Sequence, residues 1–353
     1  MSKSTVLVTL DSMKYPNTGL FHFGKSLGKA LIKENNHNFK LNYYIDKTAE
    51  SYFTGGDVKL IKRVPLHKLV FPKRNNFNVI HFTDQFCRLK PQKFSGKKIL
   101  TIHDLNQLYE ESWSPQKRNE YMTRLRGYID SCDHIVTISN FVAGEILTHF
   151  PQTKDKLSVI YNGADKPESI DGHAPVYQPQ KPFLFTIGIL SAKKNFHVLP
   201  ALLQDNDLEL VIAGIDSPYK NKIMAEAEKY GCLNRVKITG PVSDEDKAWY
   251  YQHCSAFVFP SLAEGFGLPV IEAMHLGKPV FLSRYTSLPE IGGDAAWYFD
   301  SFEPEAMQHV LTRGMHEFQE RKLSETIKQH AGKFTWEQTA KQYLELYDKC
   351  IAG

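Results

Sequence analysis

Two glutamates, Glu264 and Glu272, flank a glycine-rich turn within residues 257–283 and could contact one bound ligand. The segment opens with an apolar run, breaks at the turn and resumes at Pro269 with apolar residues at helical spacing. This pattern predicts a strand, a loop and a helix, because proline fits the first turn of a helix, where its missing N–H is not needed. Glu272 would then lie one turn into the helix and could point back toward Glu264.

The predicted helix start could also bind an anion. The N–H groups of Phe266, Gly267 and Leu268 would have no partner inside the helix, and a helix N-terminus favours negative charge. Carboxylates accept hydrogen bonds from sugar hydroxyls but repel bare phosphates, so this site indicates a ligand with both groups, such as a nucleotide sugar. The alternative is that Glu264 is a solvated loop residue and Glu272 a charge on the helix surface.

The string EGFGLPVIEAMHLGKPV, residues 264–280, closely resembles the Glu-x7-Glu signature of retaining glycosyltransferases of family 4. The resemblance covers nearly the whole chain, most clearly residues 188–300. It implies an α/β protein of the GT-B fold, with two Rossmann-like, doubly wound domains facing a central cleft. It also implies transfer of a hexose-type sugar from a UDP- or GDP-sugar to an acceptor hydroxyl, with retention and without a metal or other cofactor. Synthesis of bacterial polysaccharide, lipopolysaccharide or glycolipid is the implied setting.

The same resemblance implies roles for individual residues. His103 ends the strand predicted over 97–105, in the string HDL, and would reach the donor sugar together with Glu264. Glu272 would accept from the ribose hydroxyls, and Lys194 would hold the leaving diphosphate, so that His103, Glu264 and Lys194 form the catalytic set. Without the resemblance, a histidine at a strand end is a common structural group, and Lys194 reads equally well as a surface lysine.

Glycines and lysines near two further strand ends belong to the predicted donor site. The turn over residues 188–195 contains Gly188, Lys193 and Lys194. Many family members have arginine after this glycine, whereas this chain has Ile189, so either Lys193 supplies that charge or the diphosphate is held more weakly. Gly19 could let a phosphate or sugar approach the backbone, or it could be a plain turn glycine.

Length and composition are those of an ordinary globular protein with more than one domain. With 353 residues, two domains are expected, and 42% hydrophobic and 23% charged residues are typical of globular chains. No run approaches eighteen apolar residues and no signal segment is evident, which predicts a cytoplasmic protein. The five scattered cysteines favour reduced thiols over a zinc site.

The net charge of +4 hides an asymmetry between the two halves. Residues 1–166 contain 25 Lys and Arg against 15 Asp and Glu, and residues 167–353 contain 18 against 24. A basic first half favours an anionic partner, either a phosphorylated or lipid-linked saccharide acceptor or an acidic membrane surface. No nucleic-acid motif is evident.

A basic and apolar stretch, from Lys59 to Arg74, is the local candidate for such a contact. It contains no acidic residue, and a segment of this kind can lie on an anionic membrane at the inner face of the plasma membrane. The favoured alternative is a solvated segment that packs its apolar side on its own domain, because Pro65 interrupts any single long helix.

Strands and helices alternate along both halves, which predicts two doubly wound parallel sheets. Apolar runs predict strands in 5–10, 41–45, 78–83, 97–105 and 134–139, and a helix is expected over 19–34. We expect an acceptor-binding domain over 1–166, a linker over 167–182, a nucleotide-sugar domain over 183–333 and a terminal helix over 334–353 that crosses back to the first domain. A helix is also expected to begin at Asn195.

Other functions fit the same fold. A nucleotide-sugar 2-epimerase shares it, as does a phosphorylase, although no pyridoxal-phosphate lysine is identifiable. A non-catalytic sugar-nucleotide-binding protein is an alternative of a different class, against which the set His103, Lys194, Glu264 and Glu272 argues.

Overall fold

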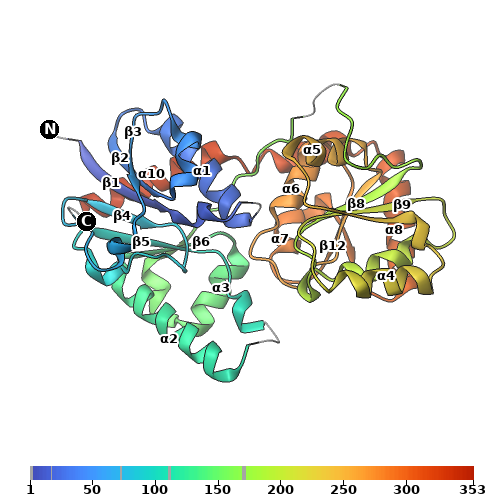
Figure 1. Ribbon diagram of the computed structural model, residues 1–353, viewed down its shortest axis with the longest axis horizontal. Helices are drawn as coiled ribbons and strands as arrows, with labels where there is room; N and C mark the ends of the chain where they lie inside the picture. Colours follow the sequence, from blue (N-terminus) through green and yellow to red (C-terminus); the bar gives the residue numbers. More distant parts are fainter. Residues whose placement is uncertain (1–2, 17, 72–73, 110–112, 169–171) are drawn as a thin grey trace. The chain divides into compact units, whose positions relative to one another are not determined.

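The chain folds into two compact units in the computed structural model (Figure 1). The first unit comprises Met1–Gly163 with Phe334–Gly353, and the second comprises Ala164–Lys333. The structure describes residues 3–16, 18–71, 74–109, 113–168 and 172–353. The two units are described separately below.

The first unit contains a parallel, seven-stranded sheet in the order β3-β2-β1-β4-β5-β6-β7. Its strands are β1 (Ser4–Leu10), β2 (Phe39–Ile45), β3 (Val58–Lys62), β4 (Val79–Phe82), β5 (Lys97–Ile102), β6 (His134–Thr137) and β7 (Leu157–Val159). Its α-helices in the described residues are α1 (Gly19–Glu34), α2 (Pro115–Ser131), α3 (Asn140–His149) and α10 (Trp336–Ala352).

A parallel sheet is covered on both faces, so its strands read as continuous apolar runs in the sequence. Val6, Leu7 and Val8 of β1 have no exposed surface. The five strands predicted in this half are confirmed, and so is the helix over 19–34, where the side chain of Thr18 accepts the N–H of Phe21. No strand was expected inside the basic stretch, but residues 58–62 pair with β2 as β3.

The C-terminal helix α10 packs in the first unit, beside α1 (Figure 1). The buried ring of His81 in β4 bonds the hydroxyl of Tyr347 at 2.7 Å and the hydroxyl of Thr101 at 2.8 Å. Tyr343 bonds Thr101 as well, at 2.9 Å. This polar network fixes α10 against the centre of the sheet.

The second unit repeats the architecture with six parallel strands in the order β10-β9-β8-β11-β12-β13. The strands are β8 (Phe183–Ile187), β9 (Glu209–Ala213), β10 (Val236–Gly240), β11 (Ala256–Phe259), β12 (Val280–Ser283) and β13 (Trp297–Phe299). The α-helices of its described residues are α4 (Lys220–Lys229), α5 (Asp244–His253), α6 (Leu268–His275), α7 (Leu288–Gly292), α8 (Pro304–Glu320) and α9 (Ser324–Ala331).

The prediction of a helix that begins at Asn195 is wrong in the type of helix and in its first residue. Two 3-10 helices, η7 (Ala192–Lys194) and η8 (Phe196–Leu203), occupy this region, and Asn195 lies between them with a left-handed φ of +59°. Pro200 falls inside η8 and has no N–H to donate, so a continuous α-helix is unfavourable there.

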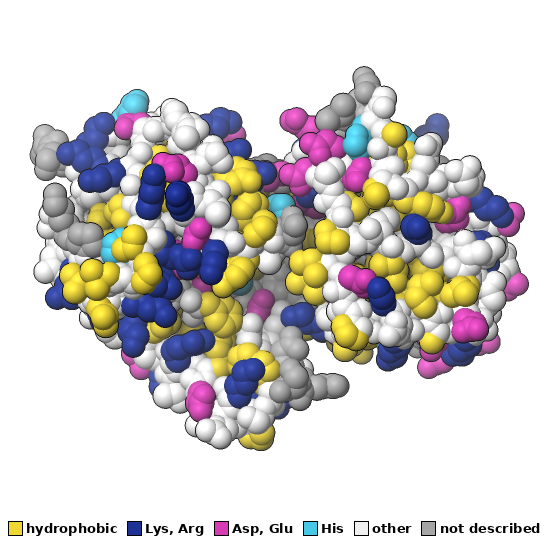
Figure 2. Space-filling view, in the orientation of Figure 1, with side chains coloured by type: hydrophobic (Ala, Val, Ile, Leu, Met, Phe, Trp, Pro, Cys, Tyr) yellow, Lys and Arg dark blue, Asp and Glu magenta, His cyan; other side chains and the backbone are white. Residues whose placement is uncertain are grey.

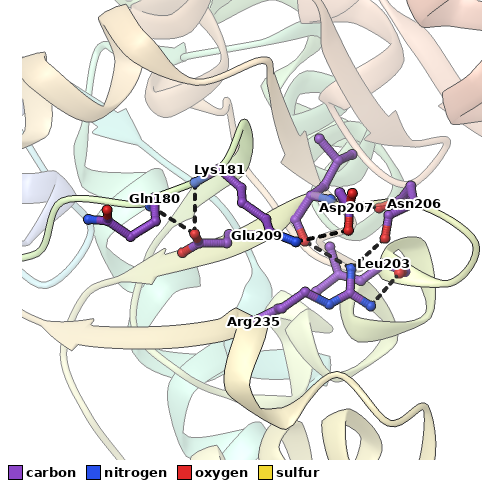
Figure 3. Close-up of polar contacts among 8 residues, drawn as sticks. Gln180, Lys181, Leu203, Asn206, Asp207, Glu209 and Arg235 are labelled. Carbon is purple, nitrogen blue, oxygen red and sulfur yellow. Dashed lines mark hydrogen bonds and ion pairs between the residues drawn. The ribbon is translucent and has the colours of Figure 1, made fainter.

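Part of the predicted linker forms hydrogen bonds and an ion pair with the second unit (Figure 3). Glu209 at the start of β9 accepts the backbone N–H groups of Gln180 and Lys181 at 2.8 and 2.9 Å, and also the hydroxyl of Tyr177. Lys181 forms an ion pair with Asp207 at 2.9 Å. Residues 177–181 are therefore part of the second unit, while residues 169–171 of the predicted linker lie outside the described residues.

In each sheet the strand order reverses at one point, between β1 and β4 in the first and between β8 and β11 in the second. Open α/β sheets bind ligands outside the carboxyl ends of their strands at this reversal. Loops that follow these four strands are therefore the places to look for a site.

Candidate functional site

An ion pair joins the loops that follow β8 and β11 in the second unit. Nζ of Lys194, at the end of η7, donates to Oε1 of Glu264 in the loop between β11 and α6. The two side chains are 16% and 14% exposed, so they meet in a shielded but accessible place. Nζ of Lys194 also lies 4.9 Å from the centre of the Phe259 ring. The sequence placed both residues in one site, and the structure brings them into contact.

The backbone of Lys193 holds these two loops together. Its carbonyl accepts the N–H of Leu262 at 2.7 Å and the hydroxyl of Ser261 at 3.1 Å. At the end of β8, a Cβ on Gly188 would lie 3.3 Å from Cε of Lys194. Glycine at this position therefore lets the lysine chain run close to the strand end.

The loop from Glu264 to the start of α6 is shaped by residues after β12 that the sequence analysis did not identify. The hydroxyl of Ser287 donates to the carbonyls of Glu264 and Phe266, both at 3.0 Å, and Oγ1 of Thr286 accepts the N–H of Glu264 at 3.0 Å. Ser287 has no exposed surface. A buried serine whose hydroxyl caps two carbonyls is recognisable only once the fold brings the loops together.

Gly267 turns the chain into α6. Its φ of +113° lies in the region that favours glycine, and a Cβ there would come within 3.0 Å of the Leu288 side chain. The helix then begins at Leu268, one residue before the predicted start. Phe266, Gly267 and Leu268 thus lie at the N-terminus of α6, where the predicted anion site requires them.

Glu272 lies in α6 with both carboxylate oxygens bonded to α5. Oε1 accepts from Nζ of Lys247 at 3.0 Å, and Oε2 accepts from the hydroxyl of Tyr251 at 2.9 Å. Burial alone would lower the pKa of Lys247, but the charge and hydrogen bond of Glu272 outweigh it and raise that pKa. Each carboxylate oxygen has two lone pairs, so Glu272 retains capacity for a ligand hydroxyl. Its contact with ribose stays a prediction.

His103 lies in the first unit, directly after β5, and is fixed as a neutral ring. Its Nε2–H donates to the carbonyl of Thr83 at 2.8 Å, and its backbone N–H donates to Oε1 of Gln85 at 3.1 Å. Burial lowers the pKa of His103 to about 4. Because Nε2 carries the proton, Nδ1 is the unprotonated nitrogen and can accept a hydrogen bond from a hydroxyl.

Gly19 is the first residue of α1, and a Cβ there would meet no atom of the described residues within 4 Å. That open space is compatible with a ligand and also with a plain turn. Gly19 and His103 belong to the first unit and the other predicted site residues to the second. Their joint contact with one donor stays a prediction.

The basic stretch meets the favoured expectation, that it packs its apolar side on its own domain, only in part, because Ile61 and Phe71 pack in the core of the first unit. Phe71 is buried, but Val64, Leu66, Leu69 and Val70 are 42%, 61%, 70% and 63% exposed. Lys62 and Arg63 form ion pairs with Glu50 and Asp46, whereas Lys59, Lys68 and Arg74 are exposed. Lys73 lies outside the described residues. We refer to Val64, Leu66, Lys68, Leu69 and Val70 as the Leu69 surface.

The described residues contain free cysteines and no cluster of metal-binding side chains. No group of three or more His, Cys, Asp or Glu side chains there is placed to hold a metal ion. All five cysteines are free, and four of them are buried. No described helix has both the length and the apolar character needed to cross a membrane.

Two protein families match most of the sequence. Residues 174–334 match the glycosyl transferases group 1, and residues 53–166 match glycosyltransferase family 4. The chain is 25% identical to the O-antigen chain mannosyltransferase B of Escherichia coli, over 97% of this chain and 99% of that protein.

Solved structures share the fold of the whole chain. Sucrose-phosphate synthase from Thermosynechococcus elongatus has a TM-score of 0.75 and 18% identity, over 99% of this chain and 100% of that one. The Anabaena protein HepE, solved in complex with UDP and glucose, has a TM-score of 0.70 and 17% identity, over 97% of this chain and 99% of that one. These similarities confirm the predicted GT-B fold.

Proposed function

Because the chain belongs to the family 4 glycosyltransferases of the GT-B fold, we propose that it moves a hexose from a nucleoside-diphosphate sugar to an acceptor hydroxyl. The proposed setting is bacterial polysaccharide, lipopolysaccharide or glycolipid synthesis. The similarity to an O-antigen mannosyltransferase supports this setting and makes mannose the first sugar to test.

The ion pair of Lys194 and Glu264 carries the proposal. It places one cation and one carboxylate side by side at the strand reversal of the second sheet, next to the N-terminus of α6. A nucleotide sugar needs both, because its diphosphate requires positive charge and its hydroxyls require acceptors. During transfer, Lys194 and the N–H groups of Phe266–Leu268 would stabilise the charge that develops on the leaving diphosphate.

The remaining predicted residues have proposed contacts with the sugar and the nucleoside. Glu264 and Nδ1 of His103 would accept hydrogen bonds from the sugar hydroxyls, and Glu272 from the ribose. Retention at the anomeric carbon and independence of metal belong to the proposal. A leaving phosphate oxygen that takes the acceptor proton is compatible with this arrangement, since the reaction then needs no separate base.

Donor binding and transfer provide the test. GDP-mannose, UDP-glucose and ADP-glucose would each be added to the purified protein, and the melting temperature recorded. A donor at 100 times its Kd stabilises the folded state by about 2.7 kcal/mol. Release of the nucleoside diphosphate, with the anomeric configuration of the product read by NMR, then identifies the reaction. A protein that neither binds nor turns over these three donors would contradict the proposal.

The acceptor is proposed to be an anionic or lipid-linked saccharide that meets the first unit at a membrane surface. Lys and Arg side chains are prominent on the face of the first unit seen in Figure 2, in keeping with its excess of positive charge. The Leu69 surface adds exposed apolar side chains to this charge. Apolar side chains next to lysine favour the interface of an anionic membrane, so this surface supports a peripheral contact.

A further inference from the structure

Several polar atoms of the first unit are buried without a hydrogen-bond partner of good geometry among the described residues, and four of them belong to side chains at one edge of the sheet. They are Oδ1 of Asp11, the hydroxyl of Tyr44, Nδ1 of His67 and Nε of Arg88. Buried polar atoms nearly always have a partner in folded proteins, and an unsatisfied one costs free energy. We refer to these four residues as the Tyr44 cluster and ask what would satisfy it.

The four side chains of the Tyr44 cluster are neighbours. The rings of Tyr44 and His67 lie 5.7 Å apart, centre to centre. Burial raises the pKa of Asp11, and backbone N–H groups and the charges of Arg63 and Arg88 partly offset this effect. Arg88 acts electrostatically on both Tyr44 and His67, and its side chain is close enough to the Tyr44 hydroxyl for a weak hydrogen bond. One ligand could therefore reach several of the four atoms.

The cluster occupies the ligand-binding edge of the first sheet. Asp11 directly follows β1 and Arg88 lies in the loop after β4, the two strands between which the order reverses. Tyr44 is near the carboxyl end of β2, on the other side of β1. The Lys194–Glu264 pair has the equivalent place in the second sheet, so each unit has polar side chains where the fold binds ligands.

The charges of the cluster favour a ligand with hydroxyl groups over a phosphate. Arg63 is engaged by Asp46 at 2.6 Å, which leaves Arg88 to balance Asp11. A phosphate would add negative charge beside Asp11. A sugar hydroxyl can donate to Oδ1 of Asp11 and accept from Nε–H of Arg88 or from the hydroxyl of Tyr44, so it suits both kinds of unsatisfied atom.

We propose that the Tyr44 cluster binds one uncharged sugar ring of the acceptor. Asp11 accepts a hydrogen bond from a ring hydroxyl, and Tyr44 and Arg88 donate to ring oxygens. This assignment rests on the proposed sugar transfer and adds to it the class of group that the first unit recognises. Any phosphate or lipid of the acceptor then lies outside the cluster.

The segment from Pro65 to Phe71 contacts the cluster, and the proposal requires this segment to shift when the sugar enters. The ring of Phe71 lies 5.6 Å from that of Tyr44, and Arg88 donates to the carbonyl of Pro65 at a long 3.4 Å. The outer side of the segment carries the exposed Leu66 and Leu69. Nζ of Lys93 also donates to the carbonyl of Lys68 at 2.8 Å, and the movement has to displace the buried ring of Phe71.

Tyr44→Phe tests the proposal because it removes only the hydroxyl, which has no partner of good hydrogen-bond geometry. We expect affinity for methyl α-mannoside, methyl α-glucoside or methyl α-galactoside, titrated into the full chain and followed by NMR, to fall about 3- to 10-fold. Asp11→Asn removes a charged acceptor and should weaken binding about 10- to 100-fold. The melting temperature of Tyr44→Phe should change little, because the hydroxyl has no hydrogen bond of good geometry to lose.

Tyr347→Phe is the matched control. The hydroxyl of Tyr347 is bonded to His81 in the same unit, so this variant should melt lower and bind the glycosides as the wild type does. Three outcomes would overturn the proposal: no glycoside binds the wild type, Tyr44→Phe and Asp11→Asn bind as tightly as wild type, or inorganic phosphate binds in a manner that Arg88→Gln abolishes.

Hydrolysis of the donor in water separates this inference from the proposed function. It needs the donor site but no acceptor, so the Tyr44→Phe and Asp11→Asn proteins should hydrolyse the donor at the wild-type rate. Donor hydrolysis with unaltered glycoside binding in both variants rejects the cluster and leaves the function standing. Absence of donor binding and hydrolysis in the wild type rejects the function itself.

Discussion

Lys194 and Glu264 come from loops after different strands, and their ion pair spans the point where the strand order of the second sheet reverses. Each side chain is largely shielded, so each holds the other in position before a ligand arrives. A diphosphate that enters would attract Lys194, and the Glu264 carboxylate could then accept hydrogen bonds from sugar hydroxyls. We therefore propose that the pair is preorganised for a ligand that carries both groups.

The first prediction is that Lys194→Ala lowers turnover strongly. Removal of a preorganised partner for developing negative charge typically costs about 10²–10³ in rate. Initial rates with the donor identified by thermal stabilisation provide the measurement. Lys220→Ala is the control, because Lys220 forms an exposed ion pair with Asp216 in the same unit. Equal rates for the two variants would remove Lys194 from the catalytic set.

The second prediction concerns Glu272. Glu272→Ala should weaken donor binding by roughly 1.5–3 kcal/mol, because the ribose hydroxyls lose a charged acceptor. Isothermal titration with the correct nucleoside diphosphate measures the change. Unchanged affinity would show that Glu272 serves only the structure of the second unit.

The partners of Glu272 supply the control for that experiment. Tyr251→Phe removes one hydrogen bond to the carboxylate and leaves the carboxylate in place. It should lower the melting temperature while nucleotide affinity stays near the wild-type value. A parallel loss of affinity in both variants would mean that the orientation of α6, and not a contact with ribose, determines binding.

The third prediction is that activity persists in EDTA. Lys194 and the N–H groups at the start of α6 are proposed to carry the charge compensation that a divalent ion would otherwise supply. Rates in about 5 mM EDTA, which is enough to remove trace metal, should match those in buffer with Mn²⁺. Loss of activity on chelation, restored by Mn²⁺, would overturn the metal-free mechanism.

Local sequence pattern was sufficient for most of the fold. Buried parallel strands read as apolar runs, so β1 and β4 could be placed from composition alone. The proximity of Lys194 and Glu264 was also expected, because each follows a predicted strand and such strand ends meet at one edge of a parallel sheet. The choice of Lys194 as a site residue depended on the family resemblance, and the ion pair itself was not predicted.

The features that were missed depend on contacts between distant residues. Nothing near Glu272 in the sequence indicates that Lys247 and Tyr251 bond its carboxylate, since α5 and α6 come together only in the fold. The helix expected at Asn195 failed because a local break, Pro200, outweighed the apolar spacing. The exposure of Leu69 could not be predicted, because an apolar side chain normally favours burial.

The fourth prediction is that the first unit binds anionic membranes through the Leu69 surface. Leu66→Ser, Leu69→Ser and Val70→Ser together should reduce flotation with liposomes that contain phosphatidylglycerol. Lys68→Ser with Arg74→Ser should reduce it further at low salt, by up to about 1 kcal/mol per charge near the membrane surface. Because the Debye length is about 8 Å at physiological ionic strength, the charge effect should weaken as salt rises.

Leu233→Ser is the control for the apolar changes. Leu233 is 47% exposed but belongs to the second unit, so its replacement should leave flotation unchanged. Flotation that ignores lipid charge, salt and the changes on the Leu69 surface would leave that surface as a solvated face. The positive charge of the first half would then be better explained by a soluble, phosphorylated acceptor.

The fifth prediction is a pH dependence of stability caused by Asp84, which is buried beside Asp11. Burial and then the carboxylate of Asp11 raise the pKa of Asp84 to about 7, against about 3.9 in an unfolded chain. Between these values the folded protein keeps a proton that the unfolded chain has released. The contribution of Asp84 to the free energy of unfolding therefore falls as pH rises, by about 1.4 kcal/mol per pH unit.

Asp84→Asn should remove this contribution, because the amide does not ionise and its oxygen can still accept the N–H of Phe86, now bonded at 2.7 Å. In denaturant titrations, the free energy of unfolding of the variant should rise relative to that of the wild type from pH 4 to pH 7. Above pH 7 the difference between the two free energies should be constant. Asp207→Asn is the control, because the Asp207 side chain is 90% exposed. Its free energy of unfolding relative to wild type should not change from pH 5 to pH 8, a range above the usual aspartate pKa. A difference between Asp84→Asn and wild type that stays flat from pH 4 to pH 7 would mean that Asp84 ionises in the folded protein as an ordinary aspartate does.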